Sequence, residues 1–207
     1  MQAALLPLRS STRSRGATMA RKLKRSLPGD KPSRKREQDI DSMIRVNHAG
    51  EYGAKRIYAG QLAVLGHDPQ LKKLIEHMAE QEQVHLDYFE NEVIKRGVRP
   101  TALHPVWHVA GFALGAITAR ISPSAAMACT VAVEEVISEH YGEQLAALAN
   151  KPEEKTLREK IKKFKAEEEE HGHIGLENDA ERAPAYRLLS AVIKRGSKIA
   201  IEIAKRV

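Results

Sequence analysis

The chain contains the same pattern of residues twice. Six residues recur 83 positions later and five others recur 86 positions later, and Phe for Met is the only change of type. The first copies are Glu51, Tyr58, Gln61, Leu62, Ala63, Leu65, Leu71, Ile75, Met78, Glu82 and His85. The second copies are Glu134, Tyr141, Gln144, Leu145, Ala146, Leu148, Leu157, Ile161, Phe164, Glu168 and His171. The interval changes only at a predicted turn, where insertions are tolerated, so the pattern indicates a duplicated helical hairpin.

After Glu37 the sequence predicts helices separated by turns, without an alternating strand pattern. The expected helices cover residues 39–65, 70–96, 106–119, 124–149 and 152–179, and a last helix begins near residue 184. A length of 207 residues favours one domain with an extension over two domains. We therefore expect an all-α domain over residues 37–207, with six helices in two pseudo-repeats.

The repeated Glu and His residues lie on the apolar stripes of their helices. Ile75, Met78, Glu82 and His85 follow one another at steps of three and four residues, which places them on one face. Six polar side chains are therefore predicted to face one core: Glu51, Glu82, His85, Glu134, Glu168 and His171. Burying a carboxylate without a partner is costly, so four together require positive charge. Two divalent cations would balance them. A Glu from each of two helices and a Glu-x-x-His from each of two others is the donor set of ferritin-like dimetal bundles.

The donor types indicate iron. An oxygen-rich set with two imidazoles and no thiolate favours iron or manganese over copper(I), structural zinc and iron–sulfur clusters. Iron is expected because two adjacent Fe(II) ions can reduce O₂ together. We assign Glu51, Glu82 and His85 to one ion and Glu134, Glu168 and His171 to the other. Which glutamates bridge the two ions is left open, and no further catalytic residue is predicted.

A second Glu-x-x-His pair, Glu170 and His173, overlaps the one chosen. It is displaced by two residues, about 200° around the helix, from the apolar stripe, so we expect it outside the core. Glu167, Glu169 and Glu170 are expected to be solvated. His48, Tyr58 and Tyr141 either support neighbouring ligands or pack in the core, and Cys129 is expected to be buried and inert.

The positive charge of the chain is concentrated at its N-terminus. Residues 1–36 hold eleven basic residues and one acidic residue, whereas the whole chain has a net charge of +7. This extension, rich in Arg and Ser, is typical of a mitochondrial transit peptide and is expected to be disordered. No aromatic residue is interleaved with its charges, so nucleic-acid binding is not expected.

Two segments could contact a membrane. Residues 106–119 are nearly uncharged and too short to span a bilayer, and Trp107 favours the interface. Residues 185–207 combine apolar residues with six basic residues and one acidic residue, which suits anionic lipid head groups. For both, an ordinary packed helix is the alternative. Gly111 and Gly115 would allow another helix to approach closely.

Four segments of the sequence resemble the demethoxyubiquinone hydroxylases of ubiquinone biosynthesis. They are IRVNHAGEYGA at 44–54, RIYAGQ at 56–61, GFALGA at 111–116 and ACTVAVEE at 128–135. The resemblance covers about residues 39–207, and its metal ligands fall on the six residues that the repeat selects.

The resemblance implies an O₂-dependent di-iron monooxygenase that hydroxylates the demethoxyubiquinone ring, the penultimate step of ubiquinone biosynthesis, with NADH as the electron source. It also implies a peripheral position on the matrix face of the mitochondrial inner membrane and a lipid-binding partner protein. The oligomeric state is left open. The alternative is a ferritin-like protein of iron storage or peroxide detoxification.

Overall fold

The computed structural model describes residues 34–207, with side chains from residue 39 onward. These residues belong to one compact unit, Ser33–Val207. Residues 1–33 of the extension lie outside the described residues, so the transit peptide stays a prediction.

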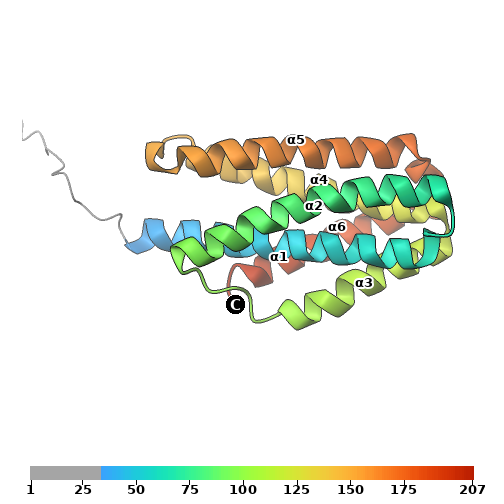
Figure 1. Cartoon of the computed structure of the whole chain (residues 1–207), viewed down its shortest axis with the longest axis horizontal. Coiled ribbons are helices and arrows are strands. Elements are labelled where there is room, and N and C mark those ends of the chain that lie inside the picture. Colours follow the sequence, from blue (N-terminus) through green and yellow to red (C-terminus); the bar gives the residue numbers. More distant parts are fainter. Residues whose placement is uncertain (1–33) are drawn as a thin grey trace, which may run out of the picture. The chain divides into compact units, whose positions relative to one another are not determined.

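Six α-helices make up the described part of the chain (Figure 1). They are α1 (Arg34–Leu65), α2 (Pro69–Arg96), α3 (His104–Ile121), α4 (Pro123–Leu148), α5 (Lys155–Glu177) and α6 (Tyr186–Ala204), with short 3₁₀ turns η1 (Pro152–Glu154) and η2 (Ala180–Arg182). No strand occurs among residues 34–207. The predicted all-α fold with six helices is confirmed.

All six helix starts differ from the prediction, by one to five residues, and three of these differences have a local cause in the sequence or backbone. Helix α1 begins at Arg34, inside the predicted extension, because the five residues before Asp39 are good helix formers and no proline occurs between Pro32 and Pro69. Helix α5 begins at Lys155 because the residues before it form the 3₁₀ turn η1. Helix α6 begins only at Tyr186, since Ala185 adopts a left-handed conformation with φ of 51°.

Local signals explain where the paired helices begin and end. The Asp68 side chain accepts hydrogen bonds from the backbone N–H groups of Gln70 and Leu71, at 2.8 and 3.1 Å, and so caps the start of α2. Gly97, with φ of 66°, ends this helix in the left-handed conformation that glycine adopts without strain. Ser122 caps α4 in the same way as Asp68, through the N–H of Ala125 at 3.0 Å.

Helices α1 and α2 form one hairpin and α4 and α5 form the other, as the repeat predicts (Figure 1). Helix α3 packs mainly on α1, and α6 packs mainly on α4. A Cβ atom on Gly115 would overlap the backbone of Ile57 in α1, so glycine permits the close approach of α3 that the sequence predicts. None of the described helices has the length and apolar character needed to cross a bilayer.

Two of the four clusters of buried apolar residues in the described part of the chain flank the repeated Glu and His residues. One cluster includes Leu65, Ile75, Met78, Met127 and Val131. The other includes Ile44, Phe89, Tyr141, Leu148, Leu157 and Phe164. Along each helix of the two hairpins, the repeated Glu and His residues lie between the two clusters. The site is therefore closed by apolar side chains at both ends.

Candidate metal centre

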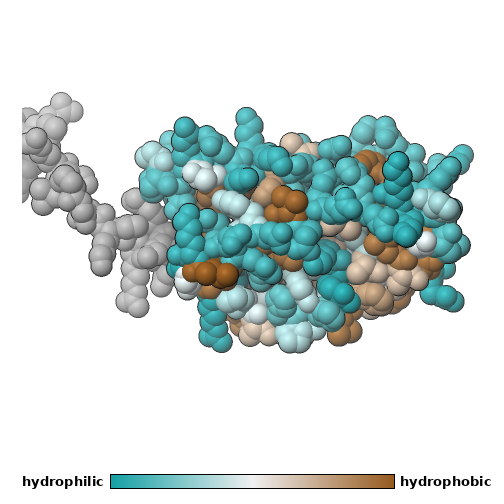
Figure 2. Space-filling model, in the orientation of Figure 1, coloured by the Kyte–Doolittle hydropathy of each residue, from teal (hydrophilic) through white to brown (hydrophobic). Residues whose placement is uncertain are grey.

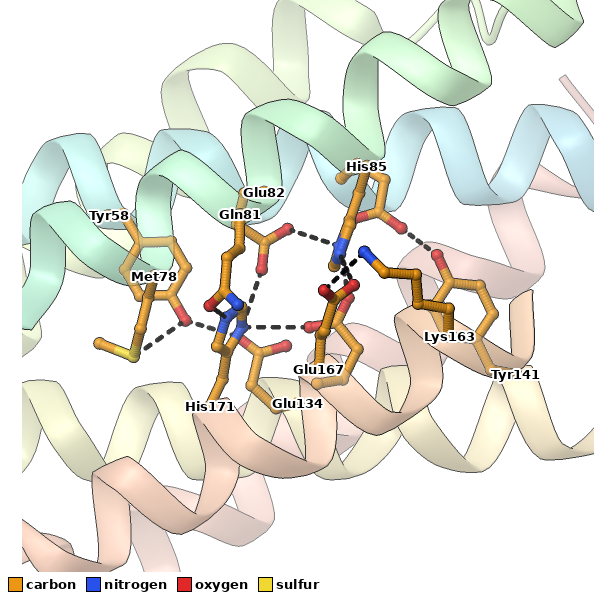
Figure 3. A network of polar contacts seen from close by, with 12 residues as sticks. Tyr58, Met78, Gln81, Glu82, His85, Glu134, Tyr141, Lys163, Glu167 and His171 are labelled. Carbon is orange, nitrogen blue, oxygen red and sulfur yellow. Dashed lines mark hydrogen bonds and ion pairs between the residues drawn. The ribbon is translucent and has the colours of Figure 1, made fainter. Parts of the chain in front are cut away.

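All six predicted ligands converge in the middle of the bundle. Figure 3 labels Glu82, His85, Glu134 and His171 among them. Glu51 comes from α1, Glu82 and His85 from α2, Glu134 from α4, and Glu168 and His171 from α5. Each is at most 2% exposed. The helical stripes read from the sequence therefore point toward one another.

The six residues form two overlapping groups of four. In each group, one potential ligand atom from every member lies within 4.8 Å of the others. The groups are Glu51, Glu82, His85 and Glu168, and Glu82, Glu134, Glu168 and His171. Glu82 and Glu168 belong to both groups, so they can serve two cations at once. The sequence assigned each of them to a single cation and left open which glutamates are shared.

The two histidines face these shared glutamates in equivalent ways. His85 Nδ1 lies 3.1 Å from Glu168 Oε1 and 4.0 Å from Glu82 Oε2. His171 Nδ1 lies 3.2 Å from Glu82 Oε1 and 3.3 Å from Glu168 Oε2. The duplicated sequence thus gives a site whose halves are related by approximate two-fold symmetry.

Several potential metal-ligand atoms of this site have no hydrogen-bond partner among the described residues. They are Glu51 Oε2, both carboxylate oxygens of Glu82, Glu134 Oε2, Glu168 Oε2 and His171 Nδ1. A buried polar atom without a partner is costly, and native proteins hold few of them. Gathered within a few ångströms, these atoms fit a pair of metal ions.

The buried carboxyl groups also shift one another's pKa values. Burial raises the pKa of Glu82 and Glu134 well above the usual value, and the neighbouring carboxylates raise both further. For His85, burial favours a lower pKa, but the carboxylates of Glu168 and Glu51 outweigh it and raise the pKa to about 10. Bound divalent cations would relieve the repulsion that these shifts express.

Two tyrosines donate hydrogen bonds to ligand carboxylates across the pseudo-symmetry axis. Tyr58 of α1 donates to Glu134 Oε1 at 2.8 Å, and Tyr141 of α4 donates to Glu51 Oε1. Burial, reinforced by the carboxylates, raises the pKa of both phenols well above the usual value, so they stay protonated donors. The sequence did not decide whether these tyrosines support ligands or only pack in the core. Their hydrogen bonds to Glu134 and Glu51 show that they support ligands.

The outward nitrogens of the histidines are also held. His85 Nε2 lies 3.0 Å from Glu167 Oε2, and His171 Nε2 lies 2.8 Å from Gln81 Oε1. The expectation that Glu167 is solvated is therefore wrong: its side chain is only 19% exposed because it reaches back over His85. The available signal was the repeat, since Gln81 and Glu167 are also 86 positions apart.

Other candidates lie outside the two ligand groups. Glu169, Glu170 and His173 are exposed, as predicted. His48 is buried, 4.0 Å from Glu90 and stacked near the ring of His104, and joins neither group.

Comparison with known proteins agrees with this geometry. Residues 38–204 match the family model described as ubiquinone biosynthesis protein COQ7. The chain is 53% identical to the mitochondrial NADPH-dependent 3-demethoxyubiquinone 3-hydroxylase of Bos taurus over 81% of this chain and 78% of that protein. It is 51% identical to the human protein of the same name, over the same shares of the two chains. It is 50% identical to the 3-demethoxyubiquinol 3-hydroxylase of Rhodospirillum rubrum over 87% of this chain and 83% of that protein.

The names of the bovine and human relatives specify NADPH. This corrects the expectation of NADH, for which the sequence offered no nucleotide-binding motif of its own. The family match and these identities extend over nearly all of the described residues. The chain therefore belongs to the ubiquinone biosynthesis protein COQ7 family.

Proposed function

We propose that this chain is an O₂-dependent 3-demethoxyubiquinone hydroxylase with two iron ions at the buried Glu and His residues and NADPH as the source of electrons. The observation that carries the proposal is the pair of overlapping ligand groups at the centre of the bundle. The relatives' names supply the substrate, the reaction and the reductant.

The six residues would hold the two iron ions as a nearly symmetric set. Glu51 and His85 would hold one ion and Glu134 and His171 the other, while Glu82 and Glu168, which belong to both ligand groups, would serve both. Bound iron supplies the reductive activation of O₂, which no side chain of the protein provides. The donor set of four carboxylates and two imidazoles suits iron.

The protein's own residues position the ligands and exclude water. Tyr58 and Tyr141 each occupy one oxygen of a ligand carboxylate, which leaves the other oxygen, Glu134 Oε2 or Glu51 Oε2, without a hydrogen bond and available to a cation. Met78 and Phe164, both at most 1% exposed, belong to the two apolar clusters that keep the site dry. A dry, preorganised site keeps reactive oxygen species from side reactions with water.

An apolar pocket next to the site favours the proposal that the substrate is an apolar ring. It has a volume of about 240 Å³ and lies between α1, α3, α4 and α6. Its walls include Ala54, one turn from Glu51, and Val133, next to Glu134. Pockets that enclose a whole drug-sized ligand span about 300–1,000 Å³, so this one suits a quinone ring better than a complete isoprenoid lipid.

The helices that flank the pocket carry exposed apolar residues. Val109 and Ile117 of α3 are 66% and 61% exposed, and Figure 2 shows apolar residues over α3 on a largely hydrophilic face. On α6, Leu188 and Val192 are similarly exposed. We assign this surface to peripheral contact with the mitochondrial inner membrane on its matrix side. Basic residues of α6 would assist, although Lys194 and Lys198 form ion pairs with glutamates of α4.

The membrane assignment is tested with vesicles of phosphatidylcholine with and without an anionic phospholipid. The wild-type protein should float with the vesicles, and a Val109→Ser, Ile117→Ser variant should remain in solution. Equal flotation of both proteins would refute the role of α3. The lipid-binding partner protein stays a prediction, which co-purification from mitochondria tests.

The function itself is tested by single-turnover hydroxylation with the iron-loaded protein, demethoxyubiquinone, NADPH and O₂. Glu82→Ala and His171→Ala should abolish the hydroxylated product, because each removes a ligand from the buried site. His173→Ala is the matched control, since this exposed histidine belongs to neither ligand group. Full turnover by either ligand variant would refute the proposal. A multi-subunit shell that accumulates iron without hydroxylating the quinone would favour the iron-storage alternative, which the family match opposes.

A further inference from the structure

Each inward-facing histidine is held from behind by one polar side chain. His85 Nε2–H donates to Glu167 Oε2 at 3.0 Å, and His171 Nε2–H donates to Gln81 Oε1 at 2.8 Å. With a cation bound, both contacts would keep the ring proton on Nε2 and leave the Nδ1 lone pair to the cation; without one, His85 Nδ1 lies 3.1 Å from Glu168 Oε1. The Nε2–H bond is the outer contact that a metal-bound histidine needs in order to keep its tautomer and orientation.

The two holders occupy equivalent places in the repeat. Gln81 immediately precedes the shared Glu82, and Glu167 immediately precedes the shared Glu168. The six ligands are chemically identical between the two halves, whereas this pair is a neutral amide in one half and a carboxylate in the other. Lys163, 2.8 Å from Glu167 Oε1, pairs with the carboxylate. The two halves of the site therefore differ in the group that accepts the Nε2–H bond of each histidine.

A carboxylate that accepts the Nε2–H bond pushes electron density into the imidazole and makes it the stronger donor. A neutral amide does so less, because hydrogen bonds to ionised acceptors are about twice as strong as neutral ones. A stronger donor stabilises a more highly charged cation. The ion bound by His85 would therefore hold the ferric state more firmly than the ion bound by His171.

We propose that Glu167 and Gln81 are positioning residues whose difference makes the two metal positions unequal, so that the ion at His171 is reduced first and the ion at His85 last. The inference rests on the proposed metal centre and goes beyond it by assigning an order of reduction. Neither residue touches the cations, and each acts through the histidine that it holds.

The experiment uses the full chain loaded with iron and measures the metal content, the circular dichroism spectrum and the two one-electron midpoint potentials. Glu167→Gln gives both histidines an amide partner, and Gln81→Glu gives both a carboxylate. Each substitution keeps the size and shape of the side chain, so the fold should be retained. The doubly exchanged variant, Glu167→Gln with Gln81→Glu, has the composition and net charge of the wild type and serves as the matched control.

Outer partners of metal-bound histidines typically change metal affinity by about 10- to 100-fold. A tenfold change in the preference for ferric over ferrous iron is about 59 mV in a one-electron couple. We expect Glu167→Gln to raise the lower potential by about 59 mV and Gln81→Glu to lower the higher potential by a similar amount. The gap between the potentials should therefore narrow in both single variants and reopen in the doubly exchanged protein.

Two iron ions per chain with unchanged potentials in both single variants would overturn this inference and leave the metal centre intact. An equal shift of both potentials by Glu167→Gln would overturn it as well, because a general structural effect acts on both ions. Wild-type protein that binds no iron would overturn the proposed function together with the inference. If one single variant fails to fold, the other still tests the change in the gap.

Discussion

The Glu82→Gln substitution distinguishes two effects of this residue: the cost of burying its carboxylate when no metal is bound, and its contribution to metal binding. Glu82 belongs to both ligand groups, and neither of its carboxylate oxygens has a hydrogen bond. Burial raises the pKa of this carboxyl well above its usual value, and Glu168, Glu134 and Glu51 raise it further. In chelator-treated protein the Glu82 carboxylate therefore opposes folding, whereas an amide of the same shape carries no charge.

The expected effect on stability follows from this environment. Replacing buried ionic groups by neutral ones of similar volume often stabilises a protein by about 1–4 kcal/mol. We expect about 2 kcal/mol here, because the amide N–H groups are themselves incompletely paired in a dry site. At about 2–4 °C per kcal/mol for a protein of this size, chelator-treated Glu82→Gln should melt about 4–8 °C above chelator-treated wild type. After iron loading the order should reverse, since the variant lacks one carboxylate that belongs to both ligand groups.

Differential scanning calorimetry of the two proteins, each with chelator and with iron, measures this reversal. Glu170→Gln is the matched control, because Glu170 is exposed and outside both ligand groups. Its melting temperature should follow that of the wild type in both conditions. Chelator-treated Glu82→Gln melting below chelator-treated wild type would refute the claim that the clustered carboxylates oppose folding without cations.

Three further predictions concern single contacts. Tyr58→Phe leaves Glu134 Oε1 without its donor and should destabilise the iron-loaded protein by about 1.5–3 kcal/mol, as measured by denaturant unfolding; an unchanged midpoint would contradict the contact. Chelator-treated protein should lose thermal stability from pH 6.5 to about 10, because the pKa of His85 is raised to about 10 in the folded state and its contribution disappears as the pH rises through that range. The iron-loaded protein should not show this loss, and equal pH profiles of the two forms would argue against the shift. Gly115→Ala should destabilise the protein by about 1–3 kcal/mol in urea unfolding, because the added Cβ would meet the backbone of α1. Gly50→Ala has open space around the added Cβ and should be neutral or stabilise the helix by up to about 1 kcal/mol. Equal losses of stability in the two variants would contradict the close packing of α3.

Much of the site could be predicted from the sequence because the duplication acts as an internal comparison. It selected Glu168 and His171 over the overlapping pair Glu170 and His173, which the structure places at the surface. It also predicted the two hairpins and the apolar stripes that enclose the ligands. These features depend only on the helical period, which residue spacing determines.

Contacts between helices could not be read from spacing. The sharing of Glu82 and Glu168 depends on how closely α2 and α5 approach, and Glu167 reaches His85 only because the two helices lie side by side. The reductant was also outside the reach of the sequence, since no nucleotide-binding motif is present to name it. The start of α1 was misplaced because basic residues typical of a leader are equally good helix formers.

The most direct test of the account is the iron content of the purified protein, measured by mass spectrometry of the metal against protein concentration. Wild-type protein reconstituted with Fe(II) under anaerobic conditions should retain two iron ions per chain after desalting, and the double variant Glu82→Ala, Glu168→Ala should retain none while keeping its helical spectrum. Wild-type protein that retains no iron, or a double variant that retains as much as the wild type, would contradict a metal centre built on these glutamates.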